Sequence, residues 1–179
     1  MPTFPSAGGG IVTMYTGHQQ CLQPLLSSHA TTLNAAASTA WLTANRAFFY
    51  PFWLAHAITV LKMFVFNGAT AAGNIDVGIY TEDGRKLVSS GSTAQAGTSA
   101  LQEFDITDTL LTPGRYYLAI AKDDTTGTVF LFNSPGTRFV QGAGVLMQET
   151  AFALPATATF ATATLIQIPV FGFTTRALI

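Results

Sequence analysis

The stretch "IDVGIYTEDGRKLVSSG", residues 75–91, decides the fold class. Apolar residues alternate with polar or small ones over 75–81, which is typical of a β-strand with one face on a core. Asp83 and Gly84 then supply a tight turn, because an Asp-Gly pair tolerates positive φ angles. Residues 85–91 return as a second strand, so the stretch predicts a β-hairpin.

This hairpin is polar in a chain that otherwise carries little charge. Only 9% of the 179 residues are charged, against about 25% in a typical soluble domain. We expect the turn to be a solvated tip whose charges discourage stray edge pairing. By the alternation, Asp76 and Tyr80 lie on the face opposite the core. The residues predicted to form the exposed turn are Glu82, Asp83, Gly84, Arg85 and Lys86.

The rest of the chain repeats the pattern of short strands and turns. Further strands are predicted at 46–50, 57–66, 101–107, 115–122 and 128–133. The first two lack polar alternation, which predicts burial on both faces, and Pro51 with "LAHA" at 54–57 separates them. Short strands at this spacing predict an all-β protein with little helix, a β-sandwich or a β-barrel.

Residues 47–66 also have the length and apolarity of a membrane-spanning helix. Pro51, His56 and Lys62 stand inside the window, and a central Lys costs about 3 kcal/mol on insertion. Aromatic and β-branched residues favour strands. The N-terminus has no basic region typical of a secretory signal. We therefore expect no membrane partner.

The charges are placed unevenly along the chain. Residues 1–45 contain none, and twelve lie between 76 and 124. Because charged residues are depleted in interface cores, we expect an extended N-terminal arm over 1–40, a sandwich domain over 41–179, and subunit contacts by the arm and by 150–179. The candidate interface residues are Phe4, Ile11, Met14, Tyr15, Leu22, Leu25, Leu26, Trp41, Phe160, Leu165 and Ile168.

From Asn45 to Asp124 the chain resembles a recurrent domain of structural proteins in tailed bacteriophages. The resemblance depends on "NRAFFYPF", "GNIDVGIYTEDG", "SSGSTAQAG" and "LTPGRYYLAIA", in that order. It implies a jelly-roll sandwich in a virion protein, of the kind found in capsid decoration proteins, fibres and host-binding appendages. It covers about 80 residues, and it includes no catalytic signature.

No motif in the sequence carries catalytic chemistry. There is no Gly-x-Ser-x-Gly elbow and no phosphate loop. The single Cys21 and the scattered His18, His29 and His56 lack metal-ligand spacing. A calcium site from the acids is the alternative, but turn chemistry explains them more simply; these acids are Glu103, Asp105, Asp108, Asp123 and Asp124. We expect no enzyme activity, no cofactor and no metal.

Five aromatic residues leave a further alternative open. They either pack inside the sandwich and between subunits or form a platform on which a sugar stacks; they are Trp41, Tyr50, Trp53, Tyr116 and Tyr117.

Together these features favour a capsid decoration or cement protein, a homotrimer that contacts the major capsid protein on the virion after synthesis in the host cytoplasm. The alternatives are a tail, neck or fibre component, and a carbohydrate-binding module for host surface glycans. A net charge of −1 gives no case for nucleic acid.

Overall fold

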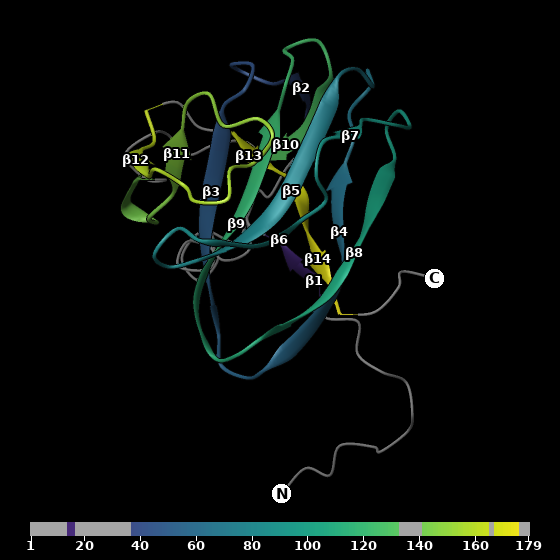
Figure 1. The fold of residues 1–179 in the computed structure, drawn as a ribbon. Coiled ribbons are helices and arrows are strands. Elements are labelled where there is room, and N and C mark those ends of the chain that lie inside the picture. The colour runs from purple at the N-terminus through teal and green to yellow at the C-terminus, as the bar shows by residue number, and fades with distance from the viewer. Residues whose placement is uncertain (1–13, 17–36, 133–140, 165–166, 176–179) are drawn as a thin grey trace, which may run out of the picture.

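The structure is a computed structural model that describes residues 14–16, 37–132, 141–164 and 167–175. In these residues the chain is almost entirely β, with several antiparallel sheets, and forms the predicted all-β sandwich (Figure 1). The jelly-roll form of the sandwich stays a prediction.

The larger sheet, here called the front sheet, has the strand order β12-β11-β3-β9-β5-β6, and β7 also pairs with β5. Its strands are β3 (Ala47–Leu54), β5 (Asn74–Thr81), β6 (Lys86–Ser89), β7 (Thr93–Ala94), β9 (Gly114–Lys122), β11 (Leu146–Gln148) and β12 (Ala161–Thr162).

The opposing layer, here called the rear layer, consists of two sheets with the orders β1-β14-β4-β8 and β13-β10-β2. Its strands are β1 (Met14–Thr16), β2 (Ala37–Ala40), β4 (Ile58–Phe66), β8 (Leu101–Leu111), β10 (Thr128–Phe132), β13 (Ile168–Pro169) and β14 (Phe171–Thr174). The chain crosses between the layers from β3 to β4 and returns from β8 to β9 (Figure 1).

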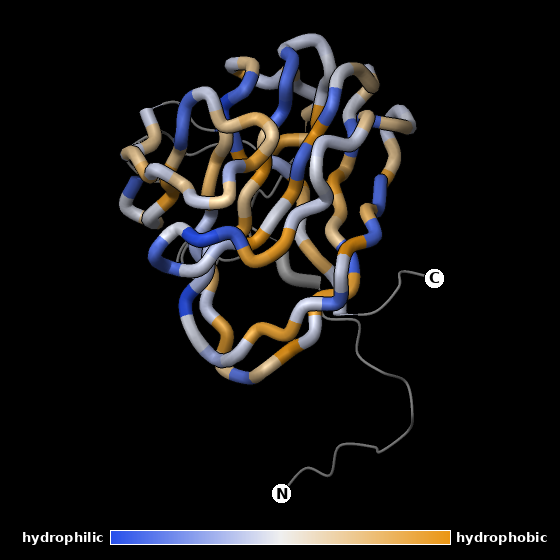
Figure 2. The backbone as a smooth tube through the Cα atoms, viewed as in Figure 1, coloured by the Kyte–Doolittle hydropathy of each residue, from blue (hydrophilic) through white to orange (hydrophobic). Residues whose placement is uncertain are grey.

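The main core lies between these layers. Alternate residues of β3, β5 and β9 point inward, as the period of two requires, and meet apolar residues of β4, β8, β10 and β14. Figure 2 shows the orange, hydrophobic segments concentrated on these strands. Aromatic pairs add to the packing, including Tyr50 with Phe171 at 5.3 Å and Phe52 with Tyr116 at 5.6 Å between ring centroids.

A second apolar cluster covers the outer face of the front sheet. Residues 149–160, here called the cover segment, cross this face between β11 and β12 (Figure 1). Phe160 packs edge-on against Phe49, with ring centroids 5.0 Å apart, and lies 4.8 Å from the ring of Tyr117. The predicted first strand, residues 46–50, is therefore buried on both faces within one chain, which confirms that prediction. The prediction is wrong for the second strand, β4, in which Thr59 is exposed and Leu61 and Lys62 are half-buried.

The strand boundaries differ from the prediction at one proline. Strand β3 continues through Pro51 to Leu54. Within the described residues, pairing on the β11 side of β3 ends at Phe49, so Pro51 interrupts no ladder hydrogen bond of that pair. The predicted break at "LAHA" is confirmed, since Ala55, His56 and Ala57 are exposed and outside the strands.

The segment that was weighed as a membrane helix and expected to form strands consists of two strands, β3 and β4. Among the described residues, none of the helices has the length and apolarity needed to span a membrane.

The predicted N-terminal arm contributes two described strands. β1 pairs with β14, and β2 pairs with β10. Paired structure therefore begins before residue 41, at edges of the two rear sheets.

Candidate functional site

The hairpin of residues 74–89 holds the cover segment in place through backbone and charged side chains. The Asp76 carboxylate accepts a hydrogen bond from the Leu154 amide at 3.0 Å, and Lys86 Nζ donates to the Leu154 carbonyl at 2.6 Å. The Leu154 side chain is 2% exposed and belongs to the outer cluster. Both backbone polar groups of Leu154 are thus bound by side chains of the hairpin.

Tyr80 and the turn complete this attachment. The Tyr80 hydroxyl donates to the Pro155 carbonyl at 2.6 Å, and burial raises the pKa of that phenol. Backbone hydrogen bonds join Lys86 N to Ala156 O at 2.9 Å and Ala158 N to Gly84 O at 2.8 Å. Gly84 has φ of +88°, and a Cβ there would meet the Ala158 carbonyl oxygen at 3.0 Å, so both backbone conformation and space favour glycine.

These contacts correct the prediction for the hairpin's polar face. Asp76 and Tyr80 are fully buried, because the cover segment lies over them. Burial raises the pKa of Asp76, opposed by its hydrogen bonds. In the predicted exposed turn, Glu82, Asp83 and Arg85 are exposed, but Gly84 is buried and Lys86 is half-buried. Much of the hairpin's polarity therefore serves an intramolecular attachment.

The candidate interface residues divide into three groups. Trp41 and Ile168 are buried inside the sandwich, where Trp41 Nε1 donates to the Arg46 carbonyl at 3.1 Å, so neither side chain is available to a neighbour. This corrects the prediction for both. Phe160 is half-buried against the front sheet.

The remaining candidates are not placed as side chains. Met14 and Tyr15 lie in β1, opposite Thr174 and Phe173. Phe4, Ile11, Leu22, Leu25, Leu26 and Leu165 lie outside the described residues.

A buried lysine organises the loops at one end of the sandwich. The side chain of Lys122 is 0% exposed, and its Nζ donates to Gln95 Oε1 at 2.7 Å and to the Ala72 carbonyl at 3.0 Å. Asp124 Oδ1 lies 3.2 Å from the same Nζ. Burial lowers the pKa of Lys122, and the charge of Asp124 opposes this. Gly127 leaves space for these contacts, since a Cβ there would meet Ala72 O and Gln95 Oε1, each at 2.3 Å.

Two of the acids considered for calcium, Asp123 and Asp124, have local explanations. Asp123 accepts hydrogen bonds from the Asn74 amide at 2.7 Å and from Asn74 Nδ2 at 2.6 Å. Asp124 Oδ2 accepts from the amides of Thr126 and Gly127. Asp105 and Asp108 are exposed on β8. Within the described residues no group of three or more His, Cys, Asp or Glu side chains is placed to hold a metal ion.

Of the five aromatic residues considered as a sugar platform, four are buried. Trp41, Tyr50, Tyr116 and Tyr117 are at most 8% exposed, whereas Trp53 is 64% exposed. Tyr116 belongs to the main core and Tyr117 to the outer cluster, where the ring of Phe160 packs against it.

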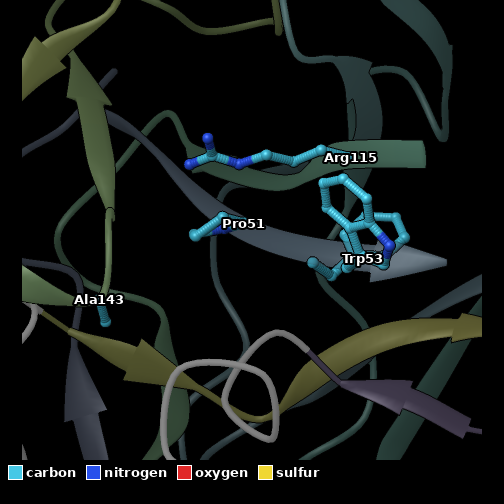
Figure 3. Close-up of a pocket in the computed structure, with 5 residues that line it drawn as sticks. Pro51, Trp53, Arg115 and Ala143 are labelled. Atoms are coloured by element: carbon cyan, nitrogen blue, oxygen red, sulfur yellow. The ribbon is translucent and has the colours of Figure 1, made fainter.

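Trp53 borders a shallow hollow of about 200 Å³ on the outer face of the front sheet. Its lining residues are Pro51, Phe52, Trp53, Arg115 and Ala143. Trp53 lies directly opposite Arg115 in the pairing of β3 with β9. Figure 3 shows the Arg115 side chain running from beside Trp53 to above Pro51, with Ala143 on the opposite side.

Arg115 is held in this position by neighbouring side chains. Its Nη1 donates to Glu82 Oε1 at 3.0 Å, its Nη2 lies 3.4 Å from the Tyr117 hydroxyl, and its guanidinium lies 5.6 Å from the centroid of the Tyr117 ring. Glu82 and Arg115 remain 61% and 37% exposed, so both reach solvent beside Trp53. Sequence reasoning missed Arg115, since only the register of β3 against β9 brings it to Trp53.

Comparisons with protein-family models, with curated proteins and with solved structures found no match for this chain.

Proposed function

We propose that this protein is a structural component of a tailed-phage particle, and within it a non-enzymatic capsid decoration or cement protein that assembles as a trimer. Support comes from the resemblance over Asn45–Asp124, the all-β sandwich and the low charge of the chain. A tail, neck or fibre position is the alternative within the particle.

The observation that carries this proposal is the exposed edge strand β2. All four of its residues, Ala37–Ala40, are exposed, none is charged, and among the described residues the strand pairs with β10 alone. Natural proteins protect such edges with charges, prolines or bulges. An unprotected edge of small residues at the end of a charge-free segment suits a strand or loop of a neighbouring subunit.

The test places a charge on this edge. Thr39→Lys changes an exposed residue of β2, and Thr98→Lys changes an exposed residue of the loop before β8 as the matched control. We expect the β2 variant to keep the urea midpoint of the wild type, to lose oligomeric mass in light scattering and to be retained poorly on purified particles. The control should behave as the wild type in all three measurements.

Two results would contradict the proposal. One is a stable wild-type monomer with no affinity for particles or for the major capsid protein. The other concerns position: particles lacking a cement protein should lose resistance to heat while still adsorbing to cells, so lost adsorption with unchanged heat resistance would favour the fibre alternative.

A further inference from the structure

We propose that the hollow beside Trp53 binds a single neutral sugar ring, with Trp53 as the stacking surface and Arg115 and Glu82 as hydrogen-bonding partners. This site is independent of the proposed role in the particle. A protein of either particle position, or of neither, could carry it.

The exposure of Trp53 is the first support. A Trp side chain buries a large apolar area when it can, yet 64% of this one is exposed, and the neighbouring Phe52 and Leu54 of β3 are in the core. Trp combines a flat apolar face with a polar N–H, which suits a ligand with one apolar face and a wet edge. A pyranose ring has these two features, since its C–H groups form a face and its hydroxyls form the rim.

The charges beside Trp53 favour an uncharged ligand. Glu82 lies 3.0 Å from Arg115 and neutralises it, so the pair offers no net charge to a phosphate or a sulfate. It does offer guanidinium N–H donors and carboxylate acceptors at the solvent edge, because both side chains are more than a third exposed. Hydroxyl groups, which donate and accept, match such a pair.

Size and rigidity restrict the ligand further. The hollow measures about 200 Å³, below the roughly 300–1,000 Å³ of sites that enclose drug-sized ligands. One ring fits better than a nucleotide or an extended cofactor. Trp53 and Arg115 stand on paired strands, and Tyr117 and Glu82 fix the guanidinium, so little ordering is needed on binding.

The experiment uses the full chain and a panel of methyl glycosides of glucose, galactose, mannose and N-acetylglucosamine, with binding measured by saturation-transfer NMR and calorimetry. We expect saturable binding of at least one glycoside with a Kd on the order of 1 mM, as few contacts allow. Trp53→Ala should weaken that binding at least about tenfold. Arg115→Met should weaken it as well, with the urea midpoint unchanged for Trp53→Ala.

Leu110→Ala is the matched control, because Leu110 is 65% exposed on β8 of the rear layer. It should leave glycoside binding unchanged. The proposal is overturned if no glycoside of the panel shows saturable binding, or if Trp53→Ala binds as the wild type does. It is also overturned if Trp53→Ala leaves glycoside binding intact but changes the oligomeric mass, which would assign the hollow to a neighbouring copy of the chain.

Discussion

Replacing Lys122 with methionine removes a buried ammonium while keeping most of the apolar stem. In the wild type, Nζ donates hydrogen bonds to Gln95 Oε1 at 2.7 Å and Ala72 O at 3.0 Å, and it forms an ion pair with Asp124 Oδ1 at 3.2 Å. The Lys122 side chain is fully buried. Without the ammonium, the first two oxygens lose a buried donor. Asp124 is 24% exposed and keeps its backbone amide donors, so it regains water more easily.

The expected loss follows from these contacts. A buried acceptor left without its partner costs about 1–3 kcal/mol, and removing one member of a buried ion pair costs about 3–5 kcal/mol. The methionine escapes the desolvation of a charge, which offsets part of this. We expect Lys122→Met to lower the free energy of unfolding by about 2–4 kcal/mol, which corresponds to a fall in Tm of roughly 4–16 °C for a chain of this length.

Urea unfolding at pH 7, followed by tryptophan fluorescence, measures the change. Lys62→Met is the matched control, because Lys62 Nζ lies 3.6 Å from Glu103 and its side chain is 29% exposed. A partly solvated pair of this kind contributes at most about 1 kcal/mol. If the two variants lose equal stability, or if Lys122→Met lies within about 0.5 kcal/mol of the wild type, the structural role assigned to Lys122 is refuted.

Three further changes test the attachment of the cover segment. Burial raises the pKa of Asp76 above its usual 3.8, so the native state holds this proton more tightly than the unfolded state, and stability falls as pH rises through the folded pKa. The free energy of unfolding of Asp76→Asn should therefore rise relative to that of the wild type between acid and neutral pH, as measured by urea unfolding. A difference that does not depend on pH would contradict this. Gly84→Ala should lower the free energy of unfolding by at least about 1 kcal/mol more than Gly91→Ala does. Both glycines have positive φ, but a Cβ at Gly84 meets Ala158 O at 3.0 Å, whereas one at Gly91 meets nothing within 4 Å. Equal losses of stability in thermal unfolding would contradict the steric argument. Phe160→Ala should lower the free energy of unfolding by about 2–3 kcal/mol with unchanged oligomeric mass, because the ring packs on Phe49 and Tyr117; a changed mass with unchanged stability would instead restore Phe160 as a subunit contact.

The fold class could be predicted because local signals determine it. Alternation over 75–81 and the Asp-Gly turn each act within a few residues, and the hairpin formed where they indicated. The strand predicted at 115–122 is found as β9. The burial of Asp76 and Tyr80 could not be predicted in this way. Their strand alternates correctly, but a segment more than seventy residues later covers the polar face.

The candidate site shows the same limit. Trp53 was among the aromatic residues singled out from the sequence, but nothing local separates it from Trp41, which is 1% exposed. Trp41 lies in the main core, whereas Trp53 lies on the outer face of the front sheet and outside the outer cluster. Arg115 enters the site only through that register, and Glu82 only through its ion pair with Arg115.

The attachment of the cover segment decides where this protein tolerates a foreign peptide. The β5–β6 turn is the obvious position for an epitope tag, yet Gly84, Arg85 and Lys86 pair there with residues 156–158, so an insertion would pull the cover away from its sheet. The bond between Gly97 and Thr98 is a better insertion point, since Ala96–Ser99 form an exposed loop. A tag placed there leaves the outer cluster intact. Gold or antibody labelling of such a variant would therefore locate the protein in the proposed particle while its fold remains undisturbed.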